Sequence, residues 1–92
     1  MTTNVMTAET CRQLAEMRAA KVIEHFEAIA GKSAMPADKV AAMLDAIRTA
    51  ARAEAAKMAA EYERDGFLAE NSEAVDHERI MTAAKAAARA AA

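Results

Sequence analysis

AARAEAAKMAAEYERDG, residues 50–66, decides the fold, because it combines strong helix-forming residues with an unusual row of side chains. Alanine, lysine, glutamate and arginine favour a helix, and the stretch has no proline or β-branched residue. Positions that advance by four and three residues share one helix face, and this face is apolar from Val40 to Met58 except where Glu54 enters it, and Glu61 follows. The stretch therefore predicts a helix whose apolar seam is interrupted by carboxylates in its second half.

The helix that contains this stretch is predicted to cover residues 37–65, roughly 43 Å at about 1.5 Å per residue. Pro36 suits its start, because proline is favoured at the beginning of a helix. Gly66 suits its end. The linker GKSAMP, residues 31–36, separates it from the preceding helix.

A helix over residues 8–30 is predicted before the linker, with Thr7 as its N-cap and Gly31 as its stop. Turning the residues by 100° each places Arg18 and His25 at the edge of its apolar arc. The arc itself contains Ala8, Cys11, Leu14, Ala15, Val22, Phe26 and Ile29.

A third helix is predicted over about residues 73–90, after the turn FLAENS. Phe67 and Leu68 are apolar anchors in this turn, and Asn71 or Ser72 would cap the helix. Its alanine-rich end has little to pack with, so we expect that end to order only on packing or binding. Its thin apolar face consists of His77, Ile80, Met81, Ala84 and Ala88.

These helices predict an all-α fold, because no segment alternates with the period of a strand. The architecture that we expect is an antiparallel helical hairpin plus a third Ala-rich helix, assembling as a dimeric helical bundle. At 92 residues the chain forms a single domain, with residues 1–7 as a flexible N-terminal tail.

The composition favours self-association. The chain has 28 alanines but only 21 larger apolar residues (Val, Ile, Leu, Met, Phe and Tyr). A buried alanine contributes one methyl, and burial is worth about 0.8 kcal/mol per methylene-sized group. A monomer would therefore have a small core, whereas a homodimer would bury more surface.

Charge and cysteine content narrow the class of protein. The formal net charge is −2, which argues against a dominant non-specific nucleic-acid binder. The single Cys11 cannot form an internal disulfide, which favours a reducing, cytoplasmic location. No apolar run is long enough to span a membrane.

Catalysis is not expected. Cys11 lies in an apolar seam without a nearby base, and the sequence has no Gly-rich cofactor loop. We therefore predict no catalytic residue and no cofactor.

A metal site is one alternative. Glu73 and His77 share a helix face, and packing the second helix against the third puts Glu61 level with His77. These three residues are the metal candidates, with His25 and Glu54 as outside candidates. A di-iron bundle would need a glutamate three residues before its histidine, which this sequence lacks.

The sequence pattern does not supply Glu54 with a cation in the same chain. Pairing the first two helices about their linker places Glu54 near Cys11 and Leu14, with no cation opposite. Because an unpaired buried charge is costly, three interpretations remain: exposure to water, pairing with Arg12 or Arg18 of a second chain, or a metal.

A DNA-associated transcriptional regulator is the other alternative. Cations in the last helix could contact phosphate. They are Arg79, Lys85 and Arg89.

The function that we expect is a small non-enzymatic protein–protein interaction module. It would act as an adaptor, regulator or inhibitor, including a phage-type inhibitor, through helical faces. Seven methionines favour an adaptable binding surface. The expected partner-binding residues are Met17, Arg18, His25, Glu54, Met58, Glu61 and Tyr62.

Overall fold

The computed structural model describes residues 7–65 and 69–91, and all regular structure within them is helical. The helices are α1 (Ala8–Ala30), α2 (Ala37–Asp65) and α3 (Ala69–Ala91). The prediction of an all-α chain is thus confirmed for this part. Gly66, Phe67 and Leu68, and the N-terminal tail before Thr7, lie outside the described residues.

The first two helices begin and end where the sequence predicts. The Thr7 hydroxyl accepts a hydrogen bond of 3.1 Å from the Thr10 backbone N–H, so Thr7 is the N-cap of α1. Gly31 follows the last residue of α1 with φ −64° and ψ −17°, a right-handed conformation open to any residue. The carbonyl of Pro36 accepts a hydrogen bond of 3.1 Å from the Val40 N–H at the start of α2.

The start of α3 was predicted too late in the sequence. The helix begins at Ala69 rather than near residue 73, so Asn71 and Ser72 lie within its first turn and are not its caps. Strong cap-forming residue types were therefore misleading here, because the backbone is already helical before it reaches them.

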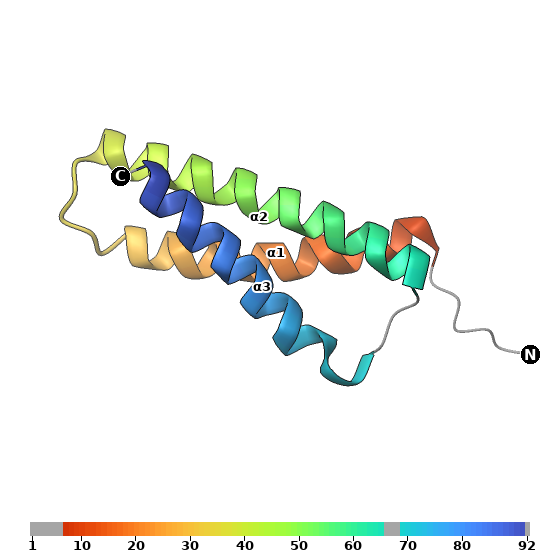
Figure 1. Ribbon diagram of the computed structural model, residues 1–92. Helices are drawn as coiled ribbons and strands as arrows, with labels where there is room; N and C mark the ends of the chain where they lie inside the picture. Colours follow the sequence, from red (N-terminus) through yellow and green to blue (C-terminus); the bar gives the residue numbers. More distant parts are fainter. Residues whose placement is uncertain (1–6, 66–68, 92) are drawn as a thin grey trace, which may run out of the picture.

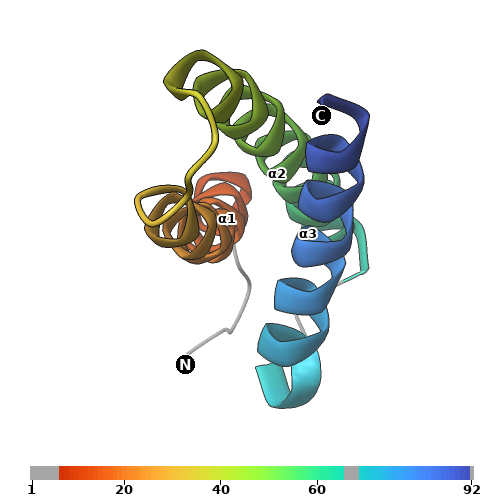
Figure 2. The same cartoon turned by 90° about the vertical axis from the view of Figure 1, so that its left-hand side faces the viewer.

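The helices form an elongated bundle in which α2 packs against both α1 and α3 (Figure 1). The linker 31–36 joins α1 to α2 at one end of the molecule, and the last turns of α3 lie near the start of α2 at that same end. Seen from this end, α3 crosses α2 at a steep angle (Figure 2). No helix in the described ranges is long and apolar enough to cross a membrane.

The core between the helices is built mainly from small side chains. Met58, Ile80, Val22 and Cys11 are its largest fully buried members. The buried apolar set is Cys11, Ala15, Ala19, Val22, Ile23, Ile47, Ala51, Ala55, Met58, Tyr62, Ile80 and Ala84. All three helices therefore contribute to one core, with α3 supplying only Ile80 and Ala84 among its fully buried apolar residues.

The α1–α2 register differs from the one inferred from the linker. That inference places Glu27 level with residue 40, whereas a 2.7 Å ion pair joins Glu27 to Arg48. The difference is about two helical turns. Counting residues from a linker cannot detect such a slide, because side-chain packing along the helices sets the register.

Candidate functional site

A buried polar cluster of Arg18, Tyr62 and Asp76 joins the three helices. Arg18 of α1 donates a hydrogen bond of 2.8 Å to the Tyr62 hydroxyl of α2. It also forms an ion pair with the carboxylate of Asp76 in α3, to which the Tyr62 hydroxyl donates in turn. The Arg18 and Asp76 side chains are only 9% and 8% exposed, so the ion pair is shielded from water.

Local helix geometry explains why these side chains meet. Arg18 lies three residues after Ala15 and four before Val22, on the buried face of α1. Tyr62 lies four residues after Met58, and Asp76 lies four before Ile80, so each polar group continues an apolar row. The cluster therefore lies at one end of the apolar rows of α2 and α3 and within the apolar row of α1.

The cluster holds the Tyr62 hydroxyl in its protonated form. Burial, together with the hydrogen bond to Asp76, raises the pKa of Tyr62 to about 12, although Arg18 lowers it. The hydroxyl is thus neutral at physiological pH and donates its proton to Asp76. This arrangement suits a structural role for Tyr62 in joining the helices, since a protonated phenol does not act as a base near neutral pH.

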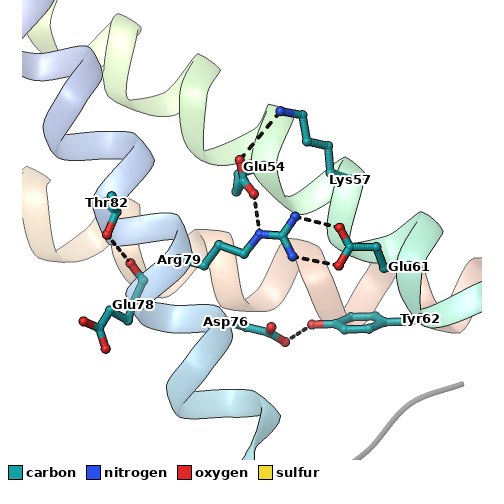
Figure 3. A network of polar contacts seen from close by, with 8 residues as sticks. All are labelled: Glu54, Lys57, Glu61, Tyr62, Asp76, Glu78, Arg79 and Thr82. Carbon is teal, nitrogen blue, oxygen red and sulfur yellow. Dashed lines mark hydrogen bonds and ion pairs between the residues drawn. The ribbon is translucent and has the colours of Figure 1, made fainter. Parts of the chain in front are cut away.

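A second cluster lies beside the first and consists of Arg79, Glu54 and Glu61 (Figure 3). The guanidinium of Arg79 in α3 donates two hydrogen bonds to the Glu61 carboxylate, at 2.8 and 2.7 Å. Its Nε donates to Glu54, and Lys57 lies 3.9 Å from the other Glu54 oxygen. These hydrogen bonds raise the pKa of Arg79, so the group keeps its charge. The Arg79 cluster therefore fastens α3 to the second half of α2.

The positions of the two seam carboxylates correct the expectation that Glu54 lacks a same-chain partner. Its partner is Arg79 of α3, which pairing the first two helices alone could not reveal. The Glu54 side chain is 17% exposed, so neither full exposure nor a second chain is needed to explain it. Arg18 is likewise buried and engaged within the chain, and is not available at a surface.

The prediction that Glu61 lies level with His77 is nearly right, but the two side chains are not brought together. Glu61 contacts Arg79, two residues beyond His77, and His77 is exposed. Glu73 forms a 3.2 Å ion pair with Lys21 across the surface from α3 to α1. Within the described part of the chain, no group of three or more His, Cys, Asp or Glu side chains is placed to hold a metal ion.

The remaining candidate residues divide between core and surface. Met58 is fully buried and Tyr62 is 9% exposed, so both belong to the core. Met17 is 61% exposed, and His25 is exposed on α1 beside the ring of Phe26. Of the cations considered for nucleic acid, Arg79 is engaged in its cluster, whereas Lys85 and Arg89 are exposed one turn apart on α3.

An apolar groove lies at the end of the molecule that carries the linker, and sequence patterns did not reveal it. We call it the end groove. Its volume is about 210 Å³. Ile29 and Met35, at its edge, are 53% and 40% exposed. Its lining residues come from α1, the linker, α2 and α3: Phe26, Ile29, Ala30, Ser33, Met35, Val40, Met43, Leu44, Ile47 and Ala88.

The end groove depends on tertiary structure, because its walls are far apart in the sequence. Two local features of the sequence point to the groove: Met35 in the linker, and Ile29 at the end of the apolar arc of α1. Both side chains are exposed in the structure. Neither feature places Ala88 of α3 beside them.

The chain was also compared with known proteins. No family model, curated protein or solved structure matches it. Its function is therefore argued from the residues and their arrangement.

Proposed function

We propose that this chain is a small non-enzymatic protein–protein interaction module that acts as an adaptor, regulator or inhibitor, including a phage-type inhibitor. The observation that carries this proposal is the end groove, an apolar hollow with half-exposed Ile29 and Met35 at its edge. Exposed apolar side chains around a hollow are typical of a docking surface.

The size of the end groove favours a protein partner over a small molecule. Small-molecule pockets usually measure about 300–1,000 Å³, whereas this groove measures about 210 Å³. It has room for one or two side chains projecting from a partner. An amphipathic helix presents apolar side chains one turn apart, and we take such a helix of a partner protein as the occupant.

Methionine makes the groove adaptable. Met35 and Met43 line it, and their unbranched thioethers can repack against partners of different shape. The groove adjoins the buried core, because Ile47 belongs to that core and Phe26 and Leu44 pack against it. The proposed module thus combines a fixed scaffold with a soft contact surface.

We further propose that two copies assemble as a dimeric bundle in the cytoplasm, each copy contributing an antiparallel hairpin of α1 and α2. Small exposed side chains on α2 support close helix packing between copies. They include Ala42, Ala53, Ala56 and Ala60. The buried Cys11 thiol suits a reducing compartment. Sedimentation velocity tests the assembly, and a monomeric mass over the whole accessible concentration range would contradict it.

The interaction proposal is tested with a matched pair of variants. Ile29→Asp places a charge at the end groove, and Val75→Asp places one at an equally exposed apolar site on α3 outside it. The partner is identified by affinity purification from the native host, purified, and titrated against each variant. Ile29→Asp should weaken binding at least tenfold, and Val75→Asp should leave it unchanged. Equal binding by both variants would refute docking at the end groove.

A further inference from the structure

Three exposed cations are sequence neighbours of residues that line the end groove. Lys32 precedes the lining residue Ser33, Lys39 precedes Val40, and Arg89 follows Ala88. All three cations are exposed. The linker, the first turns of α2 and the end of α3 all contribute lining residues to the groove, and Figure 2 views the molecule from this end. The chain therefore carries positive charges next to the residues of an apolar hollow.

Of the carboxylates near the same groove, two are engaged in ion pairs and one lies at a helix N-terminus. Glu27 and Asp45 both bind Arg48, at 2.7 and 3.4 Å, next to the lining residues Phe26 and Leu44. Asp38 lies in the first turn of α2, where the helix N-terminus favours an anion.

Unlike Glu27 and Asp45, the three cations are not held in ion pairs within the part of the chain that the structure describes. Within the described residues, the side chains of Lys32, Lys39 and Arg89 form no hydrogen bond or ion pair. Their charges are therefore free to act on a partner that approaches the groove.

We infer that the end groove takes a partner helix whose apolar face is flanked by acidic side chains. This inference rests on the proposed function and specifies the chemistry of its partner. Apolar contacts in the hollow would supply affinity, while the cations would select against basic partners and speed the encounter with acidic ones.

A second copy of this chain is a poor occupant of the same groove. A symmetric contact through this end would bring the cations of one copy against those of the other, because both partners present the same patch. Like charges facing each other across an interface oppose association. Charge therefore favours a different, acidic protein at the end groove.

The test uses the full chain and two synthetic helical peptides that share one leucine-rich apolar face. One peptide carries glutamate on both flanks of this face, and the other carries lysine. Fluorescence anisotropy of labelled peptide gives the Kd of each. The glutamate peptide should bind about tenfold tighter, and its advantage should shrink as salt screens the charges.

Charge-reversal variants locate the effect. The triple variant Lys32→Glu, Lys39→Glu and Arg89→Glu should reverse the preference between the peptides. Arg52→Glu is the matched control, because Arg52 is an exposed cation in the middle of α2 that does not line the end groove. It should leave the preference unchanged. Circular dichroism checks that each variant keeps its helix content.

The outcomes separate this inference from the proposed function. If both peptides bind equally and Ile29→Asp weakens both, the end groove docks a helix but the acidic preference is overturned. If neither peptide binds, or if Ile29→Asp only abolishes self-association of the chain, the inference is overturned as well. Tighter binding of the glutamate peptide that survives the triple reversal would also overturn it.

Discussion

The buried pairing of Arg18 with Asp76 is the most consequential arrangement of single residues in this protein. Both side chains are more than nine-tenths buried, so folding removes two opposite charges from water. Their attraction and the Tyr62 hydroxyl offset this desolvation cost. Such a pair adds little net stability compared with apolar residues, but it strongly disfavours any packing in which one partner is missing. It therefore fixes the position of α3 on the bundle.

Replacing one partner should cost far more than replacing both. We expect Asp76→Asn to lower the free energy of unfolding by about 3–5 kcal/mol, because it takes the carboxylate away from a buried arginine. The double variant Arg18→Met, Asp76→Leu should be less destabilised than Asp76→Asn. Urea denaturation monitored by circular dichroism gives these values.

The control for this comparison is Asp45→Asn, which changes a carboxylate whose side chain is 79% exposed. Its effect should stay below about 1 kcal/mol. If Asp76→Asn proved as mild as Asp45→Asn, the buried ion pair would not be a determinant of the fold.

The ionisation of Tyr62 should make the protein less stable in alkali. The ordinary pKa of tyrosine is 10.0, and the folded protein raises that of Tyr62 to about 12. Between these values the unfolded chain releases the phenolic proton while the folded chain keeps it. The stabilisation is therefore complete below pH 10 and is lost as pH rises toward 12.

Spectroscopy can follow this group alone, because the chain has one tyrosine. The near-ultraviolet absorbance of tyrosinate should appear near pH 12 in the folded protein and near pH 10 in urea. The free energy of unfolding also falls in alkali because lysines lose their charge. Tyr62→Phe should remove only the fall that is due to ionisation of the Tyr62 hydroxyl. Tyrosinate formation at the same pH in both states would show that the hydroxyl is not held as the structure indicates.

At the scale of the elements, α3 is attached mainly by polar contacts. It contributes Ile80 and Ala84 to the fully buried core, whereas Asp76 and Arg79 reach across to α1 and α2. The ion pair between Arg79 and Glu61 is bidentate, a geometry that lysine could not reproduce. The position of α3 thus depends on a few hydrogen bonds as well as on the apolar packing of Ile80 and Ala84.

Loss of Arg79 should loosen α3 selectively. We expect Arg79→Gln to cost about 1–2 kcal/mol, because its partly exposed ion pairs are screened by water. Amide hydrogen exchange should become faster in α3 and less so in the paired middle of α1 and α2. Arg89→Gln, on the exposed end of the same helix, is the control. Uniform acceleration over all three helices would mean that α3 does not open separately.

At the scale of the whole molecule, small side chains make the core thin. Among the described residues, alanine occupies five of the twelve buried apolar positions, so each large side chain carries a considerable share of the buried area. A chain of this size is expected to have a total stability of about 5–14 kcal/mol. Truncating one large core side chain is therefore expected to remove a large part of the free energy of unfolding.

Met58 is the sharpest test of this dependence. Met58→Ala should lower the free energy of unfolding by about 2–5 kcal/mol, since it opens a cavity in a fully buried site. Met17→Ala is the control, because Met17 is 61% exposed, and its effect should lie within about 0.5 kcal/mol. Thermal and urea denaturation measure both variants. Equal effects would show that Met58 does not contribute to the core.

Much of the helical framework could be predicted from local sequence. Alanine content, the Thr7 cap, Gly31 and Pro36 gave the limits of α1 and the start of α2, because caps and propensities act within one turn. The start of α3 was missed, since Asn71 and Ser72 favoured a later cap than the one the chain uses. The sequence predicted that Glu61 lies level with His77. This prediction was correct to within two residues, because Glu61 contacts Arg79.

The candidate sites were less predictable, because each depends on side chains from separate helices. Local sequence was enough to predict that the chain is helical, where α1 lies, and that carboxylates enter the seam of α2. The packing of the three helices was needed to show that Arg79 meets those carboxylates, that Arg18 is buried on Asp76, and that Ala88 lines the end groove. The reason is physical: helix propensity acts between neighbours in the chain, whereas ion pairs and grooves depend on the register and rotation of whole helices, which packing sets collectively.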